Sequence, residues 1–175
     1  MKKKLLLSLV GTILFIILMH IRFESAMLLA FNQENDYISK YKDEAISEMK
    51  TSNIPASIIL AQAIIESASG TSELATKANN HFGIKCNGWK GKTFFSDDDF
   101  PNECFRKYNS VLESYSDHSS FLHKKRYESL FLLKLTDYKG WAKGLKRCGY
   151  ATNPEYAQKL IAKIELHNLA ALDTH

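Results

Sequence analysis

The sequence predicts an α+β domain with a mostly helical body and a small β-hairpin lobe beside a cleft. Apolar residues recur at helical spacing through most of the chain after Tyr37. The run 58–65 is apolar apart from Gln62, which is typical of a buried helix. Between Lys85 and Tyr108 the helical period disappears, and Gly, Thr and aromatic residues indicate two short strands. The 175 residues, 45% of them hydrophobic, suffice for one core.

The amino terminus has the layout of an export signal. Residues 2–4 are lysines, and the uncharged, largely apolar run Leu5–Met19 follows them. This run is at the long end for a cleaved signal and slightly short for a membrane-spanning helix. We therefore expect residues 1–26 to be a signal peptide or an N-terminal membrane anchor. Residues 31–170 are expected to form a domain exported to the periplasm or cell envelope, which meets the membrane only through the N-terminal segment.

The excess positive charge lies in the same N-terminal segment. The formal net charge of the chain is +4, and residues 1–26 contribute +3 of it, from three lysines and Arg22 against Glu24. The rest of the chain carries +1 and is nearly neutral. We expect no nucleic-acid partner, because domains that bind nucleic acid usually present a basic surface.

The cysteines limit the covalent chemistry of the chain. Cys86, Cys104 and Cys148 are odd in number, so an exported chain can form at most one internal bridge from them. Cys86 and Cys104 bracket an excursion rich in Gly, Asp and aromatic residues that a disulfide would stabilise, and we predict that pair. Cys148 is expected to be buried and inert. The sequence contains no C-x-x-C spacing, and we expect neither a metal nor an organic cofactor.

Apolar periodicity and capping residues define the expected helices. They cover residues 36–50, 55–70, 73–78, 113–123, 138–147 and 155–167. Their candidate N-caps are, in chain order, Asn35 or Asp36, Asn53, Thr71 or Ser72, and Asp137. Gly70 and Gly149 suit the ends of two of these helices, and Pro154 suits the start of the last one.

Glu66 is the candidate catalytic acid. It lies in the last turn of the expected central helix, one turn beyond Gln62 on the same face. An apolar setting and the negative end of the helix dipole both raise the pKa of a carboxyl group. A carboxylic acid that stays protonated near neutral pH is the proton donor that glycosidic bond cleavage needs. The alternative is an ordinary helix-end glutamate that points into solvent.

The acidic loop 97–99 offers a second carboxylate. Strand alternation turns Asp97 and Asp99 to one face and Asp98 to the other, and by position from Gly91 we favour Asp98 or Asp99. Such a residue would orient water or stabilise positive charge on a sugar ring. The alternatives are a solvated turn or a calcium site, although the D-x-D-x-D-G spacing of calcium loops is missing.

The adjacent pair Asp117 and His118 is not assigned to a catalytic triad. The sequence has no Gly-flanked serine elbow, and His118 falls on an apolar helical stripe where a structural histidine is the commoner case. Trp141 and Tyr156 are expected to belong to the core.

Several blocks together resemble a known enzyme family. Residues 62–72 follow Q-x-x-x-E-S-x-x-G-x-S, and residues 79–85 read NNHFGIK. The later blocks are FRKY at 105–108, DH at 117–118 and GYATNPEYA at 149–157. In this order they are similar to glycoside hydrolase family 73, the bacterial N-acetylglucosaminidases that cleave peptidoglycan, and the likeness spans about residues 37–166.

The resemblance implies a lysozyme-like fold and hydrolysis of the β-1,4 bond after N-acetylglucosamine in peptidoglycan. Glu66 would be the proton donor and one acid of the loop 97–99 its partner, although many relatives have a Glu after a Thr-rich strand there. The residues expected to bind the glycan strand are Gln62, His81, Phe82, Trp89, Tyr108 and Tyr150. We expect a monomer.

Three other functions stay open at this point. A domain of the same fold could bind peptidoglycan as a scaffold without cutting it. It could instead act on N-linked glycoproteins, or it could be a lytic transglycosylase that leaves an anhydro product.

Overall fold

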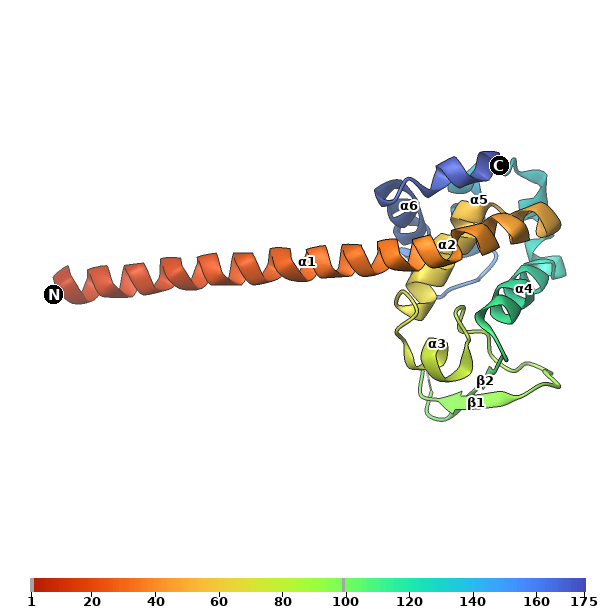
Figure 1. The fold of residues 1–175 in the computed structure, drawn as a ribbon, viewed down its shortest axis with the longest axis horizontal. Helices are drawn as coiled ribbons and strands as arrows, with labels where there is room; N and C mark the ends of the chain where they lie inside the picture. Colours follow the sequence, from red (N-terminus) through yellow and green to blue (C-terminus); the bar gives the residue numbers. More distant parts are fainter. Residues whose placement is uncertain (1, 99) are drawn as a thin grey trace. The chain divides into compact units, whose positions relative to one another are not determined.

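The computed structural model describes residues 2–98 and 100–175, with side chains from residue 15 onward. It separates into two compact units, one up to Asp36 and one from Tyr37 to His175. Helix α1 (Lys2–Ser52) makes up the first unit and contributes its last residues to the second (Figure 1). The expected helix start at Asn35 or Asp36 is wrong. The chain has neither Gly nor Pro from residue 12 to 54, so nothing in this stretch interrupts the helix.

The side chains of residues 15–36 in the first unit are mostly apolar and exposed. Helix α1 from Phe15 to Ser52, which continues past the first unit, is long and apolar enough to cross a membrane by length and composition. Its exposed large side chains include Phe15, Phe23 and Leu29. A signal sequence near the N-terminus passes the same test, so this finding fits both a signal peptide and an anchor.

Helix α2 (Ala56–Ser67) is the central element of the second unit. Ten of its residues are buried, and it packs against α5 (Tyr138–Arg147), α6 (Tyr156–Leu166) and the 3₁₀ helix η2 (Leu169–Thr174). The predicted buried helix is therefore confirmed. Figure 1 shows the chain of the second unit folded around it.

The N-terminus of α2 is capped from the far end of the chain. Asn53 was expected to cap this helix, and that expectation is wrong: Pro55 holds the N-cap position and offers no side-chain hydrogen bond. Asp173 of η2 accepts hydrogen bonds from the Ser57 backbone N–H at 2.8 Å and from the Ser57 hydroxyl at 2.7 Å. Both residues are buried. A carboxylate at this end also complements the helix dipole.

The other end of α2 is a sharp exit. Ala68, Ser69 and Gly70 have φ values of 49°, 55° and 81°, so the helix ends before the glycine that was expected to end it. The Ser67 hydroxyl accepts from the Gly70 backbone N–H at 2.7 Å. A Cβ at Gly70 would lie 3.0 Å from the ring of Tyr37. The chain therefore leaves the last turn of α2 in a fixed direction. That direction is set by the left-handed backbone of residues 68–70, the Ser67 hydroxyl and the contact with the Tyr37 ring.

The β lobe has the predicted form. After α3 (Glu73–Ala78), which Ser72 caps, β1 (Thr93–Ser96) pairs antiparallel with β2 (Glu103–Arg106). The predicted disulfide between Cys86 and Cys104 is confirmed, with an S–S distance of 2.03 Å.

The remaining helices complete the body. Helix α4 (Val111–Leu122) starts before the expected position because Ser110 caps it, and η1 (Lys125–Leu132) follows. Asp137 caps α5 as predicted, and its side chain accepts from Gly140. Cys148 is a free thiol and only partly buried.

Candidate active site

A cavity of about 310 Å³ lies in the second unit between the end of α2 and the β lobe. The helical body contributes Glu66, Phe121 and Tyr150 to its wall. The turn after α3 and the β lobe contribute Phe82, Lys85 and Asp98. The structure therefore brings the candidate acids Glu66 and Asp98, together with the predicted substrate contacts Phe82 and Tyr150, to one cavity.

Glu66 is partly buried in this wall and has a defined partner. The Tyr156 hydroxyl donates to Glu66 Oε1 at 2.8 Å. Burial raises the pKa of Glu66 above its usual range, the hydrogen bond from Tyr156 opposes that shift, and the negative charge of Asp98 adds to it. The result is a carboxyl group suited to donate a proton.

A line of buried polar side chains continues behind Tyr156. Gln62 Nε2 donates to the Tyr156 hydroxyl at 3.0 Å, and His118 Nε2 lies 3.2 Å from Gln62 Oε1. Gln62 and His118 have no exposed surface. Burial lowers the pKa of His118 to about 3, so its ring is neutral. His118 is thus a structural histidine, as the apolar stripe predicted.

Tyr156 is the residue whose role the sequence did not reveal. It was expected in the core, and it is buried, yet its hydroxyl touches Glu66. The two residues are 90 positions apart, so no local pattern joins them. One sequence feature could have indicated a role at the site: Tyr156 belongs to the same GYATNPEYA block as Tyr150. The two tyrosine rings stack with centroids 5.6 Å apart.

The acidic loop contributes Asp98 to the cavity. Lys85 Nζ lies 3.2 Å from Asp98 Oδ2 and 2.8 Å from Glu103 Oε1. Asp97 is exposed and accepts from the backbone N–H of Asn102 at 2.8 Å, which stabilises the turn. Asp99 lies outside the described residues, so its candidacy as second acid stays a prediction.

Four other predicted contacts lie away from this cavity. Gln62 is fully buried behind Tyr156, and among the described residues it does not line the cavity. His81 is also buried, with its Nδ1 2.6 Å from the Tyr37 hydroxyl. Trp89 and Tyr108 line a second, more open hollow of about 350 Å³. A role of these four residues in glycan binding stays a prediction.

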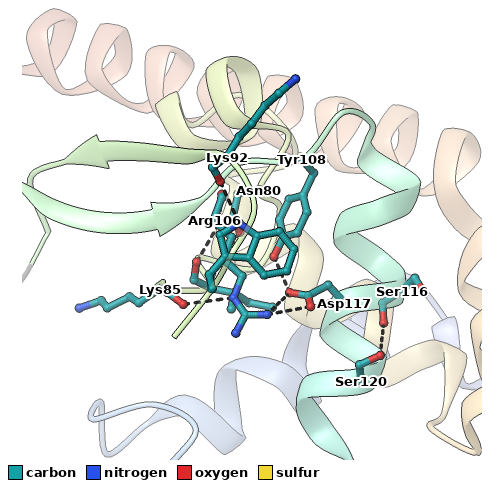
Figure 2. A network of polar contacts seen from close by, with 10 residues as sticks. Asn80, Lys85, Lys92, Arg106, Tyr108, Ser116, Asp117 and Ser120 are labelled. Atoms are coloured by element: carbon teal, nitrogen blue, oxygen red, sulfur yellow. Dashed lines mark hydrogen bonds and ion pairs between the residues drawn. The ribbon is translucent and has the colours of Figure 1, made fainter. Parts of the chain in front are cut away.

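The pair Asp117 and His118 divides between two networks. Figure 2 shows Asp117 facing Arg106, whose Nη1 lies 2.8 Å from each of its carboxylate oxygens. The Tyr108 hydroxyl donates to the same carboxylate at 2.6 Å. Arg106 also lies 4.8 Å from the centre of the Trp89 ring. Asp117 thereby ties β2 to α4, which is a structural role.

The described residues contain no group of three or more His, Cys, Asp or Glu side chains arranged to hold a metal ion.

Residues 42–169 match the family described as mannosyl-glycoprotein endo-beta-N-acetylglucosaminidase. The chain is 40% identical over 131 residues to exo-glucosaminidase LytG of Bacillus subtilis, a match that covers 67% of this chain and 45% of that protein. It is 31% identical over 143 residues to peptidoglycan hydrolase FlgJ of Salmonella typhimurium, covering 74% of this chain and 45% of that protein. The chain thus spans just under half the length of these curated relatives.

Solved structures are similar to this chain in fold as well as in sequence. The catalytic domain of the autolysin Auto from Listeria monocytogenes gives a TM-score of 0.69 at 30% identity, covering 80% of this chain and 87% of that one. The glycoside hydrolase domain of Salmonella typhimurium FlgJ gives 0.64 at 29% identity, covering 81% and 92%. The predicted lysozyme-like α+β class is confirmed. With most of its length matched in sequence and in fold, the chain belongs to the glucosaminidase family.

Proposed function

We propose that the chain hydrolyses the β-1,4 bond after N-acetylglucosamine in peptidoglycan, as an endo-β-N-acetylglucosaminidase. The observation that carries this proposal is the pairing of a partly buried Glu66, with its raised pKa, and Asp98 at one cavity. A protonated acid and a carboxylate facing one sugar site are the groups that glycoside hydrolysis uses. Relatives named exo-glucosaminidase and peptidoglycan hydrolase support the same substrate class.

The proposed reaction assigns one step to each acid. Glu66 gives its proton to the glycosidic oxygen as the bond between that oxygen and the anomeric carbon breaks. Water then adds to the anomeric carbon and gives up a proton, either to the carboxylate of Asp98 or to that of Glu66, which the first step left charged. Asp98, anchored by Lys85 in the β lobe, orients this water or stabilises the positive charge on the sugar ring. Tyr150 lines the cavity beside the bond and packs against the sugar.

The proposed setting is the cell envelope. The apolar part of α1 serves as a signal peptide or as an inner-membrane anchor, with residues 1–26 as leader and residues 31–170 as the working domain. Lysines precede the apolar run and place the amino terminus on the cytoplasmic side, so the glucosaminidase domain lies outside the cytoplasm. It meets glycan strands there as a monomer.

Digestion of purified cell wall by the full chain in detergent tests this proposal. We expect fragments that end in a new N-acetylglucosamine reducing end, identified by mass spectrometry. Mixed fragment lengths are the result for an endo enzyme, and release of single sugars would replace the endo mode with an exo mode. Anhydro ends would indicate a transglycosylase, and an absence of products would indicate a binding scaffold.

The family description supplies a second substrate for the same assay. A mannosyl glycopeptide incubated with the full chain is expected to stay intact, because several of the similar proteins are named peptidoglycan hydrolases. Release of its glycan would assign the chain to glycoproteins instead.

A further inference from the structure

Glu66 is the last of four side chains in a buried hydrogen-bonded row. The row runs from His118 through Gln62 and Tyr156 to Glu66, with separations of 3.2, 3.0 and 2.8 Å. It joins three helices, because His118 lies on α4, Gln62 and Glu66 on α2, and Tyr156 on α6. Each link has a donor and an acceptor, so the row as a whole can point one of two ways.

An unpartnered ring nitrogen decides which way the row points. His118 Nδ1 is buried, and no described residue offers it a hydrogen bond. The Phe82 ring stacks on the imidazole at 3.9 Å, which makes the surroundings apolar. A buried N–H without an acceptor is rarer in proteins than a buried acceptor without a donor. The neutral ring therefore carries its hydrogen on Nε2 and leaves Nδ1 as a bare lone pair.

The direction of every other link follows from that hydrogen. His118 Nε2–H donates to Gln62, so Gln62 presents its oxygen to His118 and its NH₂ group to Tyr156. The Tyr156 hydroxyl accepts from Gln62, and its own proton points to its other partner, Glu66 Oε1. Glu66 Oε1 therefore accepts a hydrogen bond, and the carbonyl oxygen of a carboxylic acid is a better acceptor than its hydroxyl oxygen. The acidic proton of Glu66 is thus favoured on Oε2.

We propose that Tyr156, oriented by Gln62 and His118, is a positioning residue that keeps the transferable proton of Glu66 on Oε2. The inference deepens the proposed function and rests on it for its catalytic meaning. Tyr156 also stabilises the carboxylate that remains after the proton has left, because a hydroxyl donor binds the charged form more strongly. The row thus fixes the place of the proton before transfer and lowers the energy of the product state.

Other groups act on Glu66 in the same cavity. Asp98 faces it from the acidic loop and raises its pKa, and Lys85 carries the opposite charge next to Asp98. Tyr150 packs on Tyr156 from the loop after α5 and remains a neutral phenol, because burial holds its pKa well above the usual range. Substitutions that test the row must leave these groups in place.

The first test needs no substitution and no activity. Two-dimensional ¹⁵N NMR of the histidine rings in the full chain reports which ring nitrogen of His118 carries hydrogen. We expect a neutral ring with hydrogen on Nε2. A ring with hydrogen on Nδ1 would reverse the row and overturn the proposal.

The second test removes the hydroxyl with Tyr156→Phe. We expect the titration midpoint of the Glu66 side-chain carboxyl, followed by ¹³C NMR, to move to higher pH, since the donor to the charged form is gone. Gln62→Met should move it in the same direction by less. The double variant should match Tyr156→Phe alone, because Gln62 acts only through Tyr156. An unchanged or lowered midpoint in Tyr156→Phe would overturn the proposal.

A matched control removes a tyrosine hydroxyl that donates to a glutamate away from the cavity. Tyr138 donates to Glu165 on the surface at 3.2 Å, so Tyr138→Phe should leave the Glu66 titration unchanged. In wall digestion, Tyr156→Phe should lower kcat about ten-fold or more and move the alkaline limb of the pH profile upward. The two proposals can fail separately. If the NMR tests gave the expected results but the chain did not digest cell wall, the proposed function would be refuted and the direction of the hydrogen-bonded row would still be established.

Discussion

The contact between Asp173 and the start of α2 yields a stability prediction. Asp173→Ala removes the acceptor of the Ser57 backbone N–H and of the Ser57 hydroxyl, at 2.8 and 2.7 Å. Ser57 has no exposed surface, so water cannot replace the lost partner without structural change. An unsatisfied buried donor costs about 1–3 kcal/mol, and loss of an N-cap about 1 kcal/mol. We expect the free energy of unfolding to fall by about 2–4 kcal/mol.

Chemical denaturation of the full chain, followed by tryptophan fluorescence to which buried Trp141 contributes, measures this change. Asp173→Asn keeps an acceptor for the N–H and can donate to the hydroxyl, so it should cost only about 1 kcal/mol. Asp43→Ala, at an exposed position of α1, controls for loss of an aspartate. If Asp173→Ala unfolded within about 0.5 kcal/mol of the wild type, the cap would contribute nothing and the reasoning would fail.

Two further predictions concern acid and reduction. Burial lowers the pKa of His118 to about 3 and that of His81 to about 4, so only the unfolded chain gains protons at these sites between pH 6.5 and 5. Folding stability should therefore fall on acidification, by about 2 kcal/mol per histidine at pH 5, and a flat urea midpoint over this range would contradict the assignment. Reduction of the Cys86–Cys104 bridge should lower the free energy of unfolding by about 3 kcal/mol, as the entropy of closing a loop of this size implies. Cys148→Ser should change the effect of reductant little, because Cys148 is a free thiol. A wild-type chain with the same free energy of unfolding with and without reductant would argue against the bridge.

The elements that the sequence predicted correctly have local signals. The run 58–65 is almost wholly apolar and became the buried centre of α2. Ser72 and Asp137 cap the helices that follow them, because a capping side chain bonds to a backbone N–H a few residues on. The loss of helical period after Lys85 marked the β lobe, and the two cysteines that bracket it form its disulfide.

The features that were missed depend on distant partners. The cap of α2 comes from Asp173, 116 residues away from Ser57, and no rule of local spacing finds such a contact. The contact between Tyr156 and Glu66 has the same cause. The start of a helix at Asn35 or Asp36 failed for a different reason. Capping residues only permit a helix to begin, and without Gly or Pro nearby the chain continued as one helix through them.

The sequence predicted the candidate acids of the site better than it predicted the residues around them. Glu66 could be chosen from its helix position, and the second acid could be narrowed to Asp98 or Asp99; of these, Asp98 shares a cavity with Glu66. The burial of Gln62 follows from the apolar run around it, but that of His81 could not be foreseen, since a polar residue in a motif can either touch a ligand or satisfy a buried neighbour. The packing of the second unit shows where these two side chains lie, and their role in glycan binding stays a prediction.

The rate at which Glu66→Gln releases new reducing ends from purified wall tests the catalytic assignment most directly. Glutamine keeps the shape of the side chain and an oxygen for the Tyr156 hydroxyl, yet it has no acidic proton. Loss of a general acid lowers rates about 10²–10⁴-fold, so we predict a fall of that size, with Glu128→Gln at an exposed position as the unaffected control. A Glu66→Gln chain that cut wall at the wild-type rate would show that the proton comes from another group.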